Sequence, residues 1–116
     1  MTSWREEQRA TVAVQRIDAG GLHDRIDDVQ VLDVRDRAEF VQGHIPSSVN
    51  VPYHDVTAIP DGIDGERPIA VVCSSGQRSA VAASLLQRLG ARHVLHVADG
   101  GVGTWAQQGW PLQQTP

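Results

Sequence analysis

The 116-residue sequence predicts an α/β fold built on a mainly parallel sheet. Segments with the apolar patterns of strands and of helices alternate along the chain, which is typical of layered α/β folds. Residues Ile69–Val72 form a continuous apolar run, as in a strand that is buried on both faces of a parallel sheet. Helical spacing begins shortly afterwards, at Gln77, so that strand, turn and helix follow one another.

Composition and charge are those of an ordinary soluble globular protein. Hydrophobic residues make up 41% of the chain and charged residues 21%, and the length suits one core. We therefore expect a single domain over residues 1–116, in which residues 1–10 form a polar N-terminal arm. The net charge of -4 comes from interspersed acidic and basic residues, so there is no basic cluster to indicate a nucleic-acid partner.

The single cysteine and the N-terminal residues indicate where the protein works. Cys73 has no second cysteine with which to form an intramolecular disulfide, which favours a reducing compartment. Residues 1–10 lack the apolar core of a signal peptide. No apolar run approaches the roughly 18 residues of a membrane helix. We expect a cytoplasmic protein with no membrane partner.

The first half of the chain contains strand-like and helical segments in turn. Apolar patterns predict strands at residues 29–34 and 48–51, and alternation predicts another at residues 11–16. Asp18 is suited to cap a helix over residues 19–26. A helical turn is expected at Arg37–Gln42, where Gly43 stops it.

The second half contains the clearest strand and helix. After a loop at residues 60–68, the strand Ile69–Val72 leads through a turn into a helix at residues 77–89. The apolar spacing of that helix places its core-facing stripe at Val81, Leu85, Leu86 and Leu89. A strand at residues 93–97, a glycine break and a short helix at residues 104–108 complete the pattern.

Cys73 lies where a strand ends and a helix is about to begin. Ligands of open α/β sheets bind beyond the carboxyl ends of the strands, and a helix N-terminus presents free N–H groups and a partial positive charge. A thiolate is stabilised in such a place. The same position also suits a buried, chemically inert cysteine, so that position alone leaves a nucleophile and a core residue both open.

A reactive Cys73 needs more than a helix dipole. A free thiol titrates near about pH 8.5, and bringing its pKa below neutral takes roughly 2.7 kcal/mol. A helix terminus supplies about 0.3–1 kcal/mol, and up to about 2 when it is partly buried. Directed N–H groups from residues 74–79 therefore have to add hydrogen bonds to the sulfur. Arg78 adds charge if its side chain turns towards the loop.

Three ordered segments resemble the rhodanese family. Residues 73–79 (CSSGQRS) resemble its active-site loop. The upstream signature of the family is matched by residues 32–35 (LDVR). The match continues at residues 39–40 (EF), 43–46 (GHIP) and 50–52 (NVP). The closing segment of the family is matched by residues 100–101, Trp105, Gly109 and Pro111. Together the resemblance covers roughly residues 11–112.

The resemblance implies a five-stranded parallel sheet flanked by helices on both faces, and a sulfurtransferase reaction. Cys73 would take sulfur from a small-molecule donor such as thiosulfate, hold it as a persulfide, and pass it to cyanide, a thiol or a sulfur-accepting protein. No metal and no organic cofactor is implied. The substrate cradle would consist of backbone N–H groups from the loop residues Ser74, Ser75, Gly76, Gln77 and Arg78.

Two features keep other functions open. Some thiosulfate-specific members carry basic residues after the cysteine, whereas this chain has Ser74 and Ser75, so a persulfide carrier or binding module for a partner protein is the alternative. A small phosphatase or arsenate reductase on the same scaffold is the third. Four residues separate Cys73 from Arg78, whereas related phosphatases have five, and the shorter loop favours sulfur over phosphate.

Three further residues are candidates for support around the site. Asp33 and Arg35 at the end of their strand either support the loop or form a structural ion pair, and Glu39 is expected in the same polar cluster. The hydroxyl of Ser79 is expected to cap the helix that follows the loop. The spacing of His93 and His96 matches no metal-binding pattern.

Overall fold

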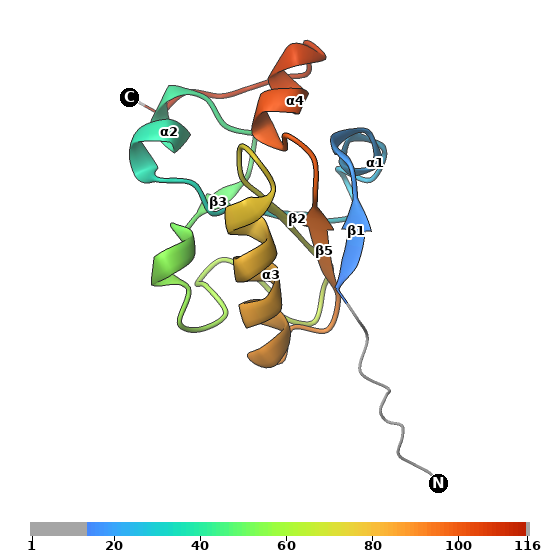
Figure 1. Ribbon diagram of the computed structural model, residues 1–116, viewed down its shortest axis with the longest axis vertical. Helices are drawn as coiled ribbons and strands as arrows, with labels where there is room; N and C mark the ends of the chain where they lie inside the picture. The colour runs from blue at the N-terminus through green and yellow to red at the C-terminus, as the bar shows by residue number, and fades with distance from the viewer. Residues whose placement is uncertain (1–13, 116) are drawn as a thin grey trace, which may run out of the picture.

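The computed structural model describes residues 14–115, and its secondary structure alternates as the sequence predicts (Figure 1). Five strands, four α-helices and one 3-10 helix follow one another in the described part of the chain. Their order is β1 (Gln15–Ile17), α1 (Ala19–Asp24), β2 (Gln30–Asp33), α2 (Arg37–Gln42), β3 (Val49–Asn50), η1 (Tyr53–Asp55), β4 (Ile69–Val72), α3 (Gln77–Arg88), β5 (Val94–Val97) and α4 (Val102–Gln107).

The strands form one sheet in the order β1-β5-β4-β2-β3, and every pair is parallel. This confirms the predicted five-stranded parallel sheet. β4 lies in its centre, where Val72 pairs with Asp33 of β2 and Val71 with His96 of β5. The carboxyl ends of the strands therefore meet at one edge, and the residues that follow β2, β4 and β5 lie close to one another there.

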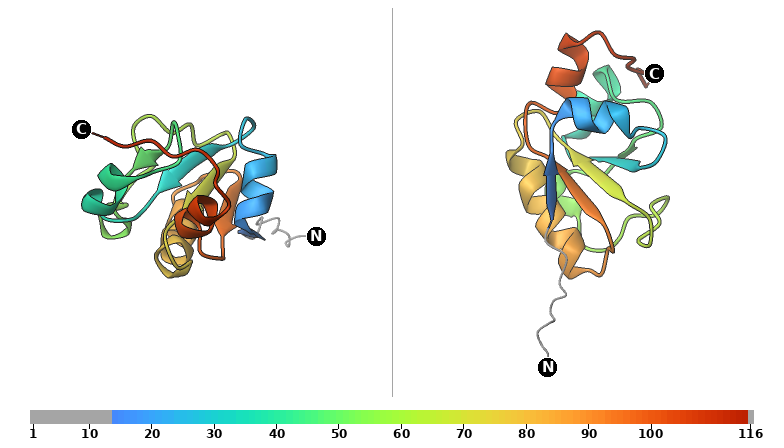
Figure 2. Two further views of the ribbon diagram at one scale, coloured as in Figure 1. Left: turned by 90° about the horizontal axis from the view of Figure 1, so that it is seen from above. Right: turned by 90° about the vertical axis from the view of Figure 1, so that its right-hand side faces the viewer.

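Helices cover both faces of the sheet, and β4 contributes to both cores. Ile69 and Val71 pack into the core beneath α3, whereas Ala70 and Val72 pack with α1 and α4. Figure 2 shows α3 running along one face of the sheet. Each residue of β4 is fully buried, which explains the continuous apolar run in the sequence, since side chains alternate between the two faces.

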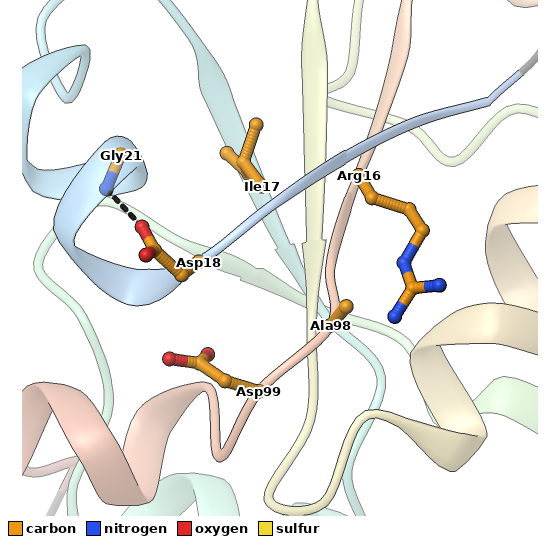
Figure 3. Close-up of a pocket in the computed structure, with 6 residues that line it drawn as sticks. All are labelled: Arg16, Ile17, Asp18, Gly21, Ala98 and Asp99. Carbon is orange, nitrogen blue, oxygen red and sulfur yellow. Dashed lines mark hydrogen bonds between the residues drawn. The ribbon is translucent and has the colours of Figure 1, made fainter.

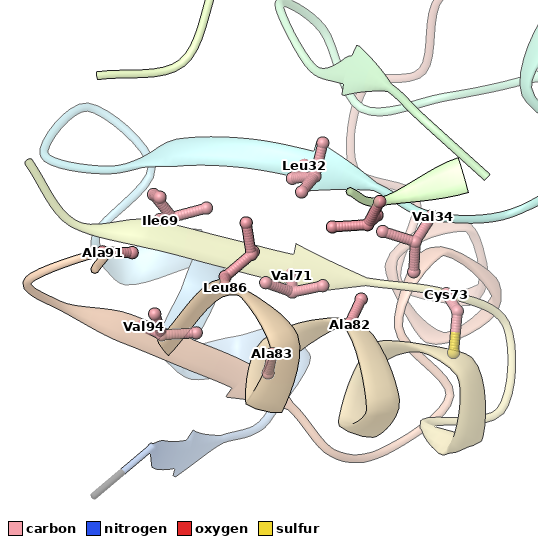
Figure 4. Close-up of a cluster of buried hydrophobic side chains, with 11 residues drawn as sticks. Leu32, Val34, Ile69, Val71, Cys73, Ala82, Ala83, Leu86, Ala91 and Val94 are labelled. Atoms are coloured by element: carbon pink, nitrogen blue, oxygen red, sulfur yellow. The ribbon is translucent and has the colours of Figure 1, made fainter. Parts of the chain in front are cut away.

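The buried stripe of α3 differs from the predicted one. Small residues face the sheet, and they are Ser79, Ala82 and Ala83, followed by Leu86 (Figure 4). Val81 is 50% exposed and Leu89 42% exposed, so the sequence prediction was wrong for both. Apolar spacing takes only the bulky side chains into account. In the structure the helix is rotated so that Ser79 reaches Cys73. Ala82, Ala83 and Leu86 follow Ser79 by three, four and seven residues and therefore share its face.

Several predicted bounds also shift. α1 ends at Asp24 instead of residue 26, and α4 begins at Val102, two residues before the predicted start, since the Trp105 N–H already donates to the carbonyl of its N-cap Gly101. The 3-10 turn η1 was not predicted, because three residues carry no periodic signal. The predicted N-terminal arm, and residues 11–13 of the predicted first strand, lie outside the described residues.

Within residues 14–115, no helix has both the length and the apolar character to cross a membrane. The same stretch contains no group of three or more His, Cys, Asp or Glu side chains arranged to hold a metal ion.

Candidate active site

Cys73 directly follows β4 at the carboxyl edge of the sheet, and its side chain points towards the first turn of α3 (Figure 4). Its carbonyl accepts a hydrogen bond from the Val102 N–H at 3.1 Å, so the start of α4 fixes its backbone. Gly101 lies against the same carbonyl, and a Cβ atom at Gly101 would collide with that oxygen. Glycine is therefore required at position 101 because the backbone at the start of α4 passes close to Cys73.

The hydrogen bonds to the Cys73 sulfur come from the loop and from α3. The N–H of Gly76 lies 3.0 Å from Sγ, the N–H of Ser79 lies 3.4 Å away, and the Ser79 hydroxyl also lies at 3.4 Å. Burial is the largest influence on the Cys73 pKa and raises it. The hydrogen bonds of Ser79, and the N–H groups of Ser75 and Gly76, together outweigh burial and hold the pKa of Cys73 below its usual value.

Ser79 does not cap the helix, contrary to the sequence prediction. Gly76 is the N-cap of α3, and Ser79 is fully buried in the first turn, where its hydroxyl lies 3.5 Å from the Val97 carbonyl as well as near the sulfur. When Cys73 is protonated, its S–H donates to the Ser79 oxygen and the hydroxyl donates to Val97. When Cys73 is ionised, the same hydroxyl can turn and donate to the thiolate.

The loop conformation depends on Gly76 and on the neighbouring strand β5. Gly76 has a φ of 84°, and a Cβ atom there would lie 2.6 Å from the Ala98 carbonyl oxygen. His96 of β5 donates its Nε2–H to the Gly76 carbonyl at 2.8 Å, and Nε2 must carry the proton because a carbonyl only accepts. Sequence reasoning missed this role of His96, because only the pairing of β4 with β5 brings it to the loop.

The predicted cradle residues take different positions around the sulfur. Gly76 donates to Sγ directly and Ser75 contributes through its N–H. Ser74 and Ser75 are exposed, and Gln77 is an exposed residue that begins α3. Ser79, which we expected only to support the site, hydrogen-bonds the sulfur through both its side chain and its N–H.

The Arg78 side chain turns towards the loop, where it also meets α2. Its Nη2 donates to Ser74 Oγ at 2.8 Å, and its two terminal nitrogens donate to the Glu39 carboxylate at 2.8 and 3.2 Å. The hydrogen bonds from Arg78 hold the pKa of Glu39 below its usual value, and those to Glu39 raise the pKa of Arg78. Glu39 therefore pairs across the site mouth with Arg78, while it lines the same pocket as Arg35 of the polar cluster in which the sequence placed it.

Asp33 and Arg35 form a buried ion pair at the end of β2. Arg35 donates from Nη2 at 2.8 Å and from Nε at 3.0 and 3.1 Å to the two carboxylate oxygens of Asp33. Arg35 Nη2 also donates to the Gly43 carbonyl, and the Asn50 amide donates to the carbonyls of Asp33 and Arg35. These contacts fix the strand end and the exit of α2, which is the structural interpretation of the pair.

A surface pocket of about 320 Å³ opens beside the cysteine loop. Its lining includes the polar residues Arg35, Glu39 and Ser74 and the apolar residues Val102, Ala106 and Leu112. Through Ser74 this pocket reaches the residue next to Cys73.

A larger pocket of about 500 Å³ lies on the other side of the loop, between β1, α1 and the end of β5 (Figure 3). Its carboxylates are already occupied by backbone N–H groups. Asp18 accepts from Gly21 at 2.7 Å, and Asp99 accepts from Ala19 at 3.2 Å and from Gly101 at 3.1 Å. These bonds begin α1 and shape the turn before α4, so the smaller pocket beside the cysteine loop is the candidate active site.

The profile of the family described as rhodanese-like domain matches residues 18–108, which include the whole Cys73 loop. The chain belongs to the rhodanese-like domain family. A sulfurtransferase of Allochromatium vinosum is 34% identical over 102 residues, which cover 85% of this chain and 94% of that protein. The thiosulfate sulfurtransferase GlpE of Pseudomonas savastanoi is 37% identical over 75 residues, which cover 65% of this chain and 70% of that protein.

The fold of this rhodanese-like domain is also that of solved relatives. The crystal structure of a rhodanese-related protein from Thermoplasma volcanium superposes with a TM-score of 0.72 at 31% sequence identity, covering 84% of this chain and 96% of that one. The family and the fold that the sequence segments indicated are thereby confirmed.

Proposed function

We propose that this rhodanese-like domain is a sulfurtransferase that carries sulfur as a persulfide on Cys73. The observation that supports this most directly is the pair of N–H groups, of Gly76 and Ser79, that donate to one sulfur atom, with the Ser79 hydroxyl beside it able to donate once Cys73 is ionised. They favour the thiolate, which is the form that attacks a sulfur donor. Sulfurtransferases among the similar proteins support the same reaction class.

The first half-reaction forms the persulfide. The Cys73 thiolate attacks the outer sulfur of thiosulfate, a new S–S bond forms, and the old S–S bond breaks as sulfite leaves with its electron pair. The product is a Cys73 persulfide anion, so the total charge of -3 on the thiolate and thiosulfate is conserved as -1 and -2. The N–H groups at the loop can then stabilise the outer, charged sulfur as they stabilise the thiolate.

The second half-reaction removes the outer sulfur and regenerates the free Cys73 thiolate. A nucleophile such as cyanide or a thiolate attacks the outer sulfur of the persulfide, and the Cys73 thiolate is the leaving group. A leaving group with a low pKa departs faster, so the same hydrogen bonds that activate Cys73 as a nucleophile also favour its release. The reaction in this form uses neither a metal nor an organic cofactor.

Access to the sulfur requires the loop to open. Cys73 is 0% exposed in the structure, and a donor sulfur has to come within bonding distance of Sγ. Ser74 and Ser75 follow Cys73 in the loop and are exposed. We expect these two residues to move when a donor enters from the adjacent pocket.

The test is a thiocyanate assay on the purified protein with thiosulfate and cyanide. We expect thiocyanate from the wild type and at least a 10³-fold lower rate from Cys73→Ser, since the nucleophile is lost. Circular dichroism of the variant checks that it is folded. Thiocyanate formation by Cys73→Ser at the wild-type rate would disprove the assignment of Cys73.

A persulfide carrier for a partner protein is the second candidate, and the neutral site mouth favours it. Ser74 and Ser75 bring no positive charge to the donor, and the sulfur is covered. A carrier would be isolated with a mass gain of one sulfur atom, or would gain it from a persulfide, while turning over thiosulfate poorly. Intact-protein mass spectrometry beside the thiocyanate assay separates the two functions.

A further inference from the structure

The positive charges at the mouth of the site are paired with carboxylates. Arg35 is bound to Asp33 at 2.8 Å, and Arg78 is bound to Glu39 at 2.8 Å. Arg35 lines the pocket beside the loop, and Arg78 donates a hydrogen bond to Ser74, the residue next to Cys73. Its charge is balanced by Glu39, and the two groups together offer the donor no net charge.

Glu39 stands on the donor's side of this pair. Its side chain is 37% exposed and lines the pocket beside the loop together with Ser74, whereas that of Arg78 is 24% exposed. A donor that enters the pocket therefore meets the Glu39 carboxylate, which is hydrogen-bonded to the Arg78 guanidinium. The Cys73 thiolate adds a further negative charge, and its interaction with Arg78 contributes to the raised pKa of that arginine.

The number of negative charges on the donor determines how strongly the Glu39 carboxylate and the Cys73 thiolate repel it. Thiosulfate brings two negative charges in a compact group, whereas an organic persulfide or thiosulfonate brings one negative charge at its sulfur group. Repulsion between like charges grows with each unit of charge and is strongest in partly buried places. A neutralised mouth therefore penalises a compact dianion more than a monoanion.

We propose that Glu39 is a specificity-determining residue that cancels the charge of Arg78 and so selects sulfur donors with a single negative charge at the sulfur group. This rests on the proposed sulfurtransferase function and deepens it by naming the donor class, organic persulfides and thiosulfonates. Glu39 acts through Arg78 and does not take part in bond making, so its removal changes the preference between donors.

The experiment compares two donors that differ by one charge. Thiosulfate gives sulfite when its outer sulfur is transferred, and methanethiosulfonate gives methanesulfinate by the same S–S cleavage; with cyanide as acceptor both reactions yield thiocyanate. The variant is Glu39→Gln, which keeps the size and one hydrogen bond to Arg78. The control is Glu66→Gln, which removes the same charge from an exposed pair with Arg92 at the opposite end of β4.

We expect Glu39→Gln to raise the ratio of kcat/KM for thiosulfate to kcat/KM for methanethiosulfonate about tenfold, on the order of one unit charge acting at a partly screened site. Glu66→Gln should leave the ratio within about twofold. A ratio that stays within about twofold in Glu39→Gln would overturn the proposal, because a merely structural effect alters both donors alike.

Alkylation of Cys73 supplies a readout that does not depend on turnover. Iodoacetate and iodoacetamide differ by one negative charge, and Glu39→Gln should increase the ratio of their rates towards iodoacetate. An unchanged ratio counts against the inference even if the variant has lost activity. If the wild-type protein forms no thiocyanate from either donor, the proposed function itself is refuted, and this inference with it. If the enzyme is active but Glu39→Gln leaves its preference between the two donors unchanged, only this inference is refuted.

Discussion

The hydroxyl oxygen of Ser79 lies 3.4 Å from the sulfur of Cys73, with no intervening residue, and 3.5 Å from the carbonyl of Val97. The hydroxyl accepts from the Cys73 S–H while it donates to the Val97 carbonyl, and it can donate to the sulfur instead when Cys73 is ionised. A buried thiolate without such a donor would be strongly disfavoured. The relationship links the rotation of α3 to the reactivity of the cysteine.

Ser79→Ala should raise the pKa of Cys73, because it removes the hydroxyl donor to the thiolate. Alkylation by iodoacetamide follows the thiolate, so its rate rises with pH and levels off above the pKa. In the wild type this plateau should begin at lower pH than for a free thiol, and in Ser79→Ala the curve should move to higher pH. At neutral pH the variant should react about tenfold more slowly.

Ser84→Ala is the matched control, since Ser84 is an exposed serine of the same helix. Its alkylation curve should overlay that of the wild type. An unshifted curve for Ser79→Ala would show that the backbone N–H groups alone stabilise the thiolate.

Gly76→Ala should destabilise the protein far more than Gly90→Ala. Both glycines have positive φ, 84° and 100°, which costs an L-residue about 1–2 kcal/mol. Only at Gly76 does the new Cβ also meet a backbone atom, the Ala98 carbonyl oxygen at 2.6 Å, whereas nothing lies within 4 Å at Gly90. Urea unfolding should show an additional loss of about 1–3 kcal/mol for Gly76→Ala, and equal losses for both variants would contradict the close packing of the loop on β5.

Asp33→Asn should reduce the free energy of unfolding by about 3–5 kcal/mol, because it leaves the buried Arg35 guanidinium without its carboxylate. Glu66→Gln breaks an exposed pair with Arg92 and should cost about 0–1 kcal/mol. Thermal and urea unfolding of the two variants measure the difference. Similar, small losses in both would mean that Arg35 finds other partners or reaches water.

Leu86→Ala and Leu89→Ala test which face of α3 is buried. Leu86 is fully buried against the sheet, so its truncation should cost about 2–5 kcal/mol. Leu89 is 42% exposed and should cost less than about 1 kcal/mol. Because the substitution is the same in both variants, their free energies of unfolding in urea can be compared directly. A larger loss of unfolding free energy for Leu89→Ala than for Leu86→Ala would support the buried face that apolar spacing predicted.

Local sequence patterns determined the architecture. The run of β4 predicted a strand buried on both faces, and the turn after it placed Cys73 between a strand and a helix, because alternation of side chains and turn residues are properties of neighbouring residues. The order of strands and helices followed in the same way. Arg37–Gln42 was predicted with its observed bounds because the stop at Gly43 is a local signal, and the structure adds a hydrogen bond from the Asp36 N–H to the Glu39 carboxylate at the start of the helix.

The tertiary structure decided which side chains meet at the site. Glu39 and Arg78 are 39 residues apart, and Gly76 and His96 are 20 apart, so their contacts exist only once β2, β4 and β5 lie side by side. The rotation of α3, which brings Ser79 to Cys73, is likewise set by packing small residues on the sheet. A single sequence therefore identified the cysteine and its loop, while the charge balance and the proton partners of that cysteine depend on contacts between distant segments.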